Sequence, residues 1–184
     1  MSRLVPKTRP QATRDEVLAI AAKNVDGIDP QTILDRDGVL IVGVRGYYLK
    51  TFGNPFKNDI NVYDDAMFIV TRESLASFNW NVDPSNNKKG VATLVPGLYQ
   101  LVKWMHKGKY AALQIIADVV KRAGMAGLDK GRHGINFHYG GDNDTWSLGC
   151  QTAPKVQYWQ FQGLVYELMD TLKLDRVKYL LIEQ

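Results

Sequence analysis

The chain has 184 residues, of which 45% are hydrophobic and 23% charged, and its formal net charge is +4. This length suits one domain with a single sizeable core, and the composition argues against a disordered protein. The basic residues are scattered, which disfavours a nucleic-acid partner but would suit an anionic polymer such as cell wall.

No segment is long and apolar enough to span a bilayer, and residues 1–16 lack the apolar run of a secretory signal. We therefore expect no stable membrane insertion and a cytoplasmic location until another protein releases the chain to the cell wall. The single cysteine rules out an internal disulfide. We expect a monomer without a cofactor.

Residues 1–37 predict an arm followed by two helices. Thr13 and Glu16 have the spacing of a capping box, which predicts a helix over 13–24. Asp29 and Pro30 suit the N-cap and first position of a second short helix, which Gly38 follows.

From Val39 onward, β-branched and aromatic residues indicate strands. Periodicity leaves strand and helix open for 110–119, where we favour a strand. The expected strands are 39–48, 60–71, 77–82, two within 90–104 broken at Pro96-Gly97, 110–119, 134–138 and 177–183. A helix is expected from Pro154 to about 172. Strands without regular helical alternation predict an α+β fold, mostly β, as a single domain over 1–184.

The candidate chemistry lies between His133 and Gln151, which contains the only cysteine and two of the three histidines. A thiol nucleophile needs a base to remove its proton, and an imidazole can do this, hold the thiolate as an ion pair and return the proton to a leaving amine. Backbone N–H groups beside a small residue such as Gly149 can stabilise the oxyanion. We therefore predict Cys150 as nucleophile and His138 as base.

Strand alternation separates the side chains of this segment into two faces. It places Ile135, Phe137 and Tyr139 on one face and Asn136 and His138 on the other. We expect Asn136 to help orient His138. Tyr139 and Trp146 are candidates for the walls of a substrate cleft.

The stretch INFHYGG…WSLGCQ resembles the active-site motif of the L,D-transpeptidase (YkuD) family, in which a histidine ends a strand and a Ser/Thr-His-Gly-Cys element follows. The resemblance assigns His138 as base and Cys150 as nucleophile, makes Ser147 and Gly149 motif residues, and puts Gln151 after the nucleophile. Leu148 replaces the usual histidine, and the intervening loop is shorter than is common. A divergent, phage-associated branch has this Ser-x-Gly-Cys-Gln version, and the looser likeness covers residues 35–170.

The resemblance implies a β-sandwich or barrel core with a few helices and a cysteine in a cleft. It implies attack on amides of peptidoglycan stem peptides through an acyl-enzyme. We expect hydrolysis, as in a phage endolysin, with cross-linking by transpeptidation as the alternative. Ser147, Trp146, Tyr139, Gln151 and Asn136 are the candidate substrate-binding residues.

Other interpretations stay open at this stage. His133 gives a second possible register for the base, although we expect it in a solvated loop, and we expect His106 to be a turn residue. His133, His138 and Cys150 could instead hold zinc, as in zinc-dependent wall amidases. A non-enzymatic wall-binding phage protein with a vestigial site is the third possibility. Papain-like and NlpC/P60-like peptidases are disfavoured, because their cysteine precedes the histidine.

Overall fold

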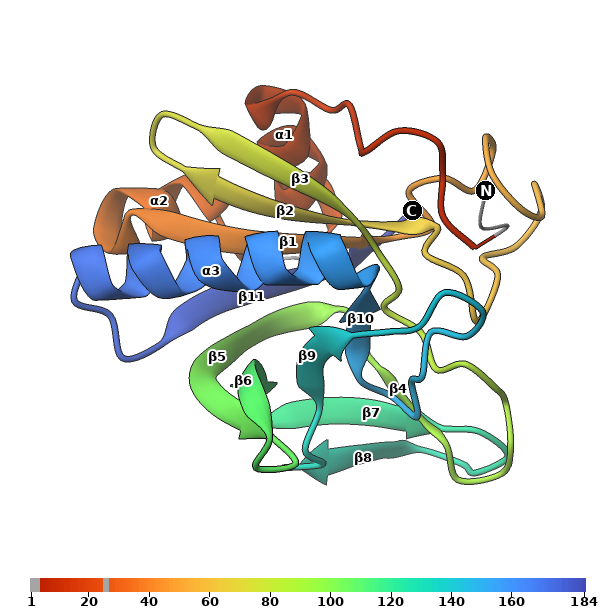
Figure 1. Ribbon diagram of the computed structural model, residues 1–184. Coiled ribbons are helices and arrows are strands. Elements are labelled where there is room, and N and C mark those ends of the chain that lie inside the picture. The colour runs from red at the N-terminus through yellow and green to blue at the C-terminus, as the bar shows by residue number, and fades with distance from the viewer. Residues whose placement is uncertain (1–3, 25–26) are drawn as a thin grey trace.

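The computed structural model describes residues 4–24 and 27–184, within which three helices and eleven strands form (Figure 1). The helices are α1 (Arg14–Asn24), α2 (Pro30–Asp37) and α3 (Lys155–Thr171). The strands are β1 (Val39–Arg45), β2 (Asp65–Thr71), β3 (Leu75–Trp80), β4 (Ala92–Leu94), β5 (Gly97–His106), β6 (Tyr110–Ile115), β7 (Asp118–Arg122), β8 (Leu128–Gly131), β9 (Asn136–Tyr139), β10 (Gln151–Ala153) and β11 (Val177–Glu183).

Eight strands form one sheet in the order β10-β9-β6-β5-β11-β1-β2-β3, and β4-β7-β8 form a second, smaller sheet. The two ends of the large sheet meet, because Asn81, just after β3, bridges to Thr152 of β10. The Asn81 N–H donates to the Thr152 carbonyl at 2.7 Å, and the Thr152 N–H donates back at 2.9 Å. The sheet is therefore a nearly closed barrel, and the predicted α+β, mostly β class is confirmed.

Both faces of the central strands are buried, and each face has its own helices (Figure 1). Ile41 and Met67 join the core that includes Phe161 of α3. Val42 and Phe68 point the other way, into a core shared with α1 and α2. This alternation explains why β1 and β2 are apolar at successive positions instead of every second one.

The helix ends follow the sequence signals. The Thr13 N–H donates to Glu16 Oε2 at 2.7 Å, and the Glu16 N–H donates to Thr13 Oγ1 at 3.3 Å, which completes the capping box. Asp29 accepts hydrogen bonds from the N–H groups at the start of α2. Gly38 ends α2 in the left-handed conformation at φ +78°.

Several predicted strands have different limits in the structure. The strand expected over 39–48 ends at Arg45, because the backbone turns at Gly46 with φ +74°. The strand expected over 60–71 begins only at Asp65, since Asn61 adopts φ +64°. The segment 110–119 forms two strands, β6 and β7, which belong to different sheets.

Strands β8 and β10 were not predicted from the sequence. Strand β8 is largely exposed and lacks apolar alternation, and β10 has three residues. Both depend on pairing with β7 and β9, which periodicity within one segment cannot reveal.

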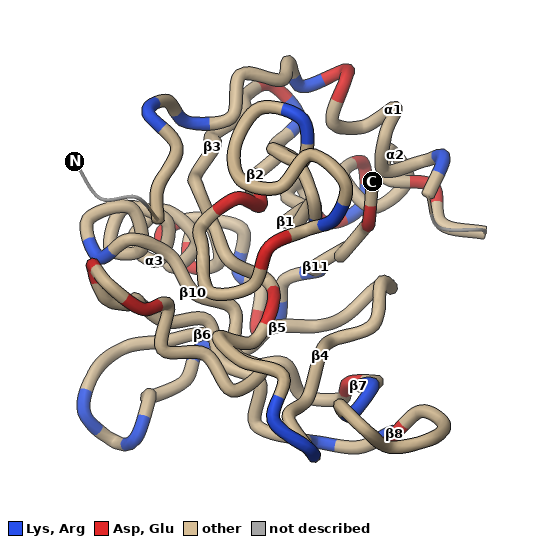
Figure 2. Tube along the Cα trace, turned by 90° about the vertical axis from the view of Figure 1, so that its right-hand side faces the viewer, with Lys and Arg blue, Asp and Glu red and all other residues tan. Residues whose placement is uncertain are grey.

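Within the described residues, neither the distribution of charged side chains nor the hydropathy of the helices marks a special surface. Lys and Arg positions are interspersed with Asp and Glu along the trace, without one continuous basic stripe (Figure 2). No helix within residues 4–24 and 27–184 is long and apolar enough to cross a membrane.

Candidate active site

Two neighbouring strands bring the predicted nucleophile and base together. Strands β9 and β10 run parallel, with Gln151 paired to Phe137 and Thr152 to His138. Cys150 directly precedes β10, so the same register puts it beside Asn136, whose backbone N–H lowers the pKa of the thiol. The loop between the strands therefore returns the chain to the start of β9.

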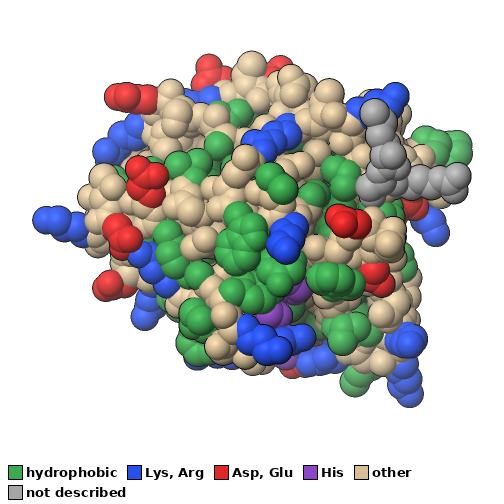
Figure 3. All heavy atoms as spheres, viewed as in Figure 1, with side chains coloured by type: hydrophobic (Ala, Val, Ile, Leu, Met, Phe, Trp, Pro, Cys, Tyr) green, Lys and Arg blue, Asp and Glu red, His purple; other side chains and the backbone are tan. Residues whose placement is uncertain are grey.

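Cys150 and His138 line the same cavity, which has a volume of about 380 Å³. Figure 3 shows histidine side chains in a hollow bordered by hydrophobic and basic side chains. The residues that line this cavity, called the thiol cavity below, are His106, Lys107, Tyr110, His138, Tyr139, Trp146, Leu148 and Cys150.

The ring of His138 is buried and held in one orientation. Its exposed fraction is 5%, and Nδ1 donates to the backbone carbonyl of Tyr139 at 2.8 Å. This bond defines the tautomer with the proton on Nδ1, so Nε2 keeps its lone pair. The ring of His106 stacks on it, with centroids 4.3 Å apart and planes 29° apart. An imidazole in this state can accept a proton at Nε2.

Burial sets the protonation of both groups. It lowers the pKa of His138 to about 4, against the opposing hydrogen bond to Tyr139, and the charges of His106 and Lys107 lower it further. Burial also raises the pKa of the Cys150 thiol, against the opposing effects of the Asn136 N–H and Lys107. These shifts favour a neutral thiol beside a neutral imidazole at pH 7, in contrast to the ion pair expected from the sequence.

Gly149 occupies a backbone position that a side chain would disturb. Its φ is +130°, and a Cβ there would lie 2.8 Å from the carbonyl oxygen of Ala92. The glycine therefore lets the loop pass close to β4 immediately before the nucleophile.

Ser147 ties the loop together from within. Its Oγ donates to the Cys150 carbonyl at 2.7 Å and accepts from the Gly149 N–H at 3.1 Å. Its backbone exchanges hydrogen bonds with Ser85, at 2.7 and 2.8 Å. The side chain is only 1% exposed, so its contacts fix the loop that presents Cys150.

Two other predicted substrate-binding side chains have internal partners. Gln151 is fully buried, donates to the Val82 carbonyl at 3.1 Å and accepts from the Tyr179 hydroxyl at 3.0 Å. The Asn136 side chain donates to the Gly134 carbonyl and accepts from Gln114. Asn136 thus reaches the site through its backbone N–H.

The outer wall of the thiol cavity is aromatic and apolar. Trp146 and Leu148 are 59% and 70% exposed, and Trp146 has φ +56°. Tyr139 stacks on Tyr110 with ring centroids 4.8 Å apart, and Lys155 lies over its ring. These rings and Leu148 form the part of the thiol cavity wall that is open to solvent.

The expectation for His106 was wrong. It is the last residue of β5, is 9% exposed and stacks on His138. The sequence analysis gave it no role, since nothing in the run Trp-Met-His-Lys-Gly-Lys links it to a segment so far along the chain. Its cross-strand partner Tyr110 also lines the cavity.

The expected solvated position of His133 was also wrong. Its Nδ1 is hydrogen-bonded to Asp118, and Nε2 lies 3.0 Å from Asp129. The hydrogen bond to Asp118 raises the pKa of His133 despite the opposing effect of burial. Because carboxylates engage both ring nitrogens, His133 has no free lone pair for the thiol, and the geometry favours His138 as the base.

The three residues of the zinc hypothesis are not assembled as ligands. Among the residues that the structure describes, no three His, Cys, Asp or Glu side chains are grouped so that they could hold a metal ion.

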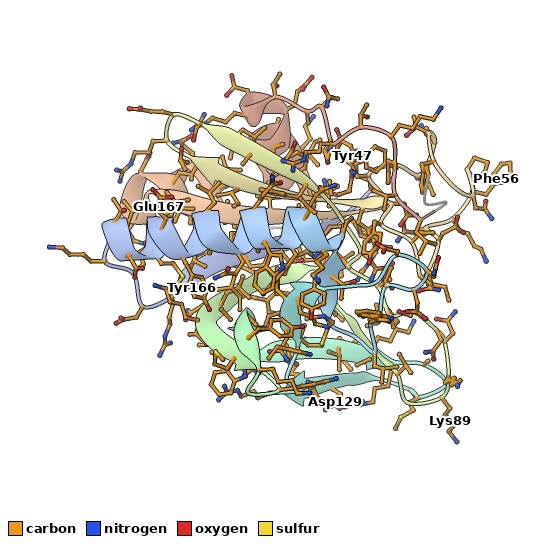
Figure 4. The ribbon with its side chains drawn as sticks, in the orientation of Figure 1. Tyr47, Phe56, Lys89, Asp129, Tyr166 and Glu167 are labelled. Carbon is orange, nitrogen blue, oxygen red and sulfur yellow. The ribbon has the colours of Figure 1, made fainter. Side chains whose placement is uncertain are left out.

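A second cavity of about 580 Å³ meets the thiol cavity at Leu148 and Cys150. Lys89, Arg122 and His133 contribute basic groups to its lining. Lys89 and Asp129 lie at the lower edge of the molecule in Figure 4, beside β7 and β8, and Asp129 pairs with Arg122 at 2.8 Å. Cys150 therefore borders two spaces, one aromatic and one basic.

The comparisons with known proteins add no relative, since no protein-family model and no curated protein matches this chain.

Proposed function

We propose that this protein is a cysteine enzyme that breaks amide bonds in peptidoglycan stem peptides, as a phage endolysin does. One observation carries the chemistry: Cys150 and a neutral, tautomer-fixed His138 line one cavity. The substrate class is supported by the likeness of the segment around His138 and Cys150 to the L,D-transpeptidase motif.

The reaction begins at the thiol. His138 Nε2 takes the proton as Cys150 Sγ attacks the carbonyl carbon, since neither group is charged beforehand. The Gly149 N–H is bound to Ser147, which leaves the Cys150 N–H as the donor that we assign to the oxyanion.

The second half of the reaction releases the acyl group. The C–N bond breaks, His138 returns its proton to the leaving amine, and a thioester remains on Cys150. Water then loses a proton to His138, attacks the thioester and regenerates the thiol as the C–S bond breaks.

Transpeptidation is the second candidate, and the existence of a second cavity that also reaches Cys150 favours it. An amine could approach the thioester through this space while the acyl chain occupies the thiol cavity. The chemistry is the same except that the acceptor amine replaces water.

The test is mass analysis of purified peptidoglycan after incubation with the wild type, Cys150→Ala, His138→Gln or His133→Gln, each with and without a chelator. We expect the wild type to release peptide fragments whether or not the chelator is present. Cys150→Ala and His138→Gln should release none, whereas His133→Gln should remain active if circular dichroism shows it folded.

The insoluble fraction separates the two candidates. New cross-linked stem peptides without soluble fragments would favour transpeptidation. Full activity of Cys150→Ala would refute both candidates, and chelator-sensitive release would point to the zinc amidase.

A further inference from the structure

His106 and His138 form a stacked imidazole pair between two strands that are distant in sequence. His106 ends β5, and His138 lies within β9, on the far side of β6 in the sheet. Their ring centroids are 4.3 Å apart, and both rings line the thiol cavity. Stacking covers a face of His138 and leaves its edge free, and the Nε2 lone pair lies in the plane of the ring.

His106 is itself held on its other side. Its ring lies 5.3 Å from that of Tyr110, its partner across the hairpin. It is 9% exposed, and its Nδ1 is buried without a hydrogen-bond partner among the described residues. A buried ring nitrogen without a partner is costly, so packing against Tyr110 alone does not account for an imidazole here.

We propose that His106 is a positioning residue for His138: it fixes the plane of the base by stacking and disfavours its protonated state. The proposal rests on the proposed function only in assigning His138 as the base. Two cationic imidazoles cannot stack without repulsion, so a neutral pair is the stable arrangement.

The other groups around the pair agree with this role. Burial lowers the pKa of both histidines. The charge of Lys107, which directly follows His106, lowers both pKa values further. Tyr110, Tyr139 and Cys150 complete the titratable groups of the cavity, and burial raises the pKa of Tyr110 to about 12 and that of Cys150 above its usual range. No carboxylate lines this cavity within the described part of the chain, so nothing there compensates for a second positive charge.

The first test is nitrogen-15 NMR of the imidazole rings, which needs no substrate. The chain has three histidines, so single variants assign every signal. In the wild type we expect His138 to be the neutral Nδ1–H tautomer down to about pH 5. His106→Phe should keep this tautomer and raise the pKa of His138, because an aromatic ring remains but the second imidazole that can take up a proton is gone. His106→Ala should give a mixture of tautomers.

The second test is turnover of peptidoglycan by the same variants, with Met105→Ala as a control from the exposed neighbour on β5. We expect His106→Ala to lower kcat about 10-fold with KM nearly unchanged, since misplacing a base costs rate more than affinity. His106→Phe should recover most of kcat, and the acidic limb of its pH profile should move to higher pH. Met105→Ala should match the wild type.

Unchanged His138 tautomer and pKa in folded His106→Ala would overturn the proposal. So would equal kcat losses in His106→Phe and His106→Ala. Because the NMR readout needs no wall substrate, the positioning role can be confirmed even if peptidoglycan is not cleaved, and the two proposals fail independently.

Discussion

At the scale of single residues, the site consists of groups that burial holds uncharged. Burial disfavours the charged forms of Cys150 and His138, and the opposing effects are a backbone group at each residue and, for Cys150, the charge of Lys107. In the proposed mechanism, the thiol is therefore activated by transfer of its proton during attack instead of by a resting ion pair.

This neutral pair predicts slow alkylation of the resting protein. We expect iodoacetamide to react with Cys150 slowly at pH 7 and the rate to keep rising above pH 9, because burial raises the pKa of the thiol. Cys150 is the only cysteine, so incorporation can be followed by intact mass. The urea-unfolded protein is the control, and a rate that levels off below pH 7 would indicate an ion pair instead.

Gly149 is the glycine of the motif that combines a positive φ with a close backbone neighbour. We expect Gly149→Ala to destabilise the fold by about 1 to 3 kcal/mol and to lower activity, because φ +130° and the Ala92 carbonyl at 2.8 Å both oppose a Cβ. Chemical denaturation measures the change.

The matched control is Gly163→Ala in helix α3, where a Cβ would meet nothing within 4 Å. Its helical position predicts stabilisation by about 0.5 to 1 kcal/mol. Equal stability effects at the two glycines would contradict the role assigned to Gly149.

The sequence was informative about site residues close together in the chain. His138, Gly149 and Cys150 lie in one segment, where the spacing of residue types indicates thiol chemistry. His106 reaches the site only through the pairing of β5, β6 and β9, and its segment holds no sign of that contact. Ser147 was expected to bind substrate, but its side chain is hydrogen-bonded to Gly149 and Cys150 in the same loop. These bonds form only once the loop has folded back on itself, so the sequence pattern does not reveal them.

At the scale of elements, the loop from β9 to β10 is fixed by hydrogen bonds to a distant segment. The hydroxyls of Ser85 and Thr145 are 2.7 Å apart, and Ser85 also bonds the backbone of Ser147. The 82–91 segment therefore supports the loop that carries the nucleophile.

Ser147→Ala tests this support. It removes the acceptor of the Gly149 N–H and the donor to the Cys150 carbonyl, so we expect a loss of about 1 to 3 kcal/mol in the free energy of unfolding and a lower kcat. Thermal unfolding and turnover measure the two effects. The exposed Ser74→Ala is the control in a turn far from the site, and a change confined to KM would instead support the substrate contact predicted from the sequence.

Helix and strand boundaries were predicted correctly where capping or chain-breaking residues within the segment itself determine them. The capping box of α1, the Asp29 cap and Gly38 end of α2, and the break at Pro96 and Gly97 all follow local rules. The boundary errors at 60–64 and 116–117 have another origin. Both segments contain strand-forming residues, but the first includes the left-handed Asn61, and the second is where the chain passes from β6 to β7 in the other sheet.

At the scale of the whole molecule, the barrel contains a second group of buried titratable side chains, none of which lines the thiol cavity. Asp65 and Asp83 are buried beside Arg45, which pairs with Asp83 at 3.0 Å, and Asp64 is buried close enough to Asp83 to feel its charge. Burial raises the pKa of Asp64 to about 7, and the charges of Asp59 and Asp83 add to the effect. One guanidinium does not balance several carboxylates, so this region favours proton uptake on folding.

The sign of the resulting pH dependence is fixed by the shifts. Asp64 has a folded-state pKa above its unfolded value, so its contribution to stability is lost as the pH rises from about 4 to about 7. His138 has a lowered pKa, so its contribution is lost as the pH falls from about 6.5 to about 4. The two effects oppose each other over the same range.

Asp64→Asn removes the contribution of the Asp64 carboxyl group to the pH dependence of stability. We expect the variant to be more stable than the wild type at pH 8 by about 1 to 3 kcal/mol, and the difference to shrink toward pH 4. Urea unfolding at several pH values measures it, with the exposed Asp15→Asn as control. A difference that is constant with pH would show that Asp64 does not titrate in this range.

The closure of the barrel has a consequence for how the site moves. Strands β9 and β10 form a two-stranded unit that is joined to β6 by two registered residue pairs. The segment after β3 is joined to β10 by the Asn81–Thr152 bridge and by the hydrogen bond of Gln151 to Val82. His138 and Cys150 both belong to the one segment of chain that forms this unit, so any displacement of the segment would carry the proposed base and the proposed nucleophile together. It would also separate His138 from His106, because His106 belongs to β5.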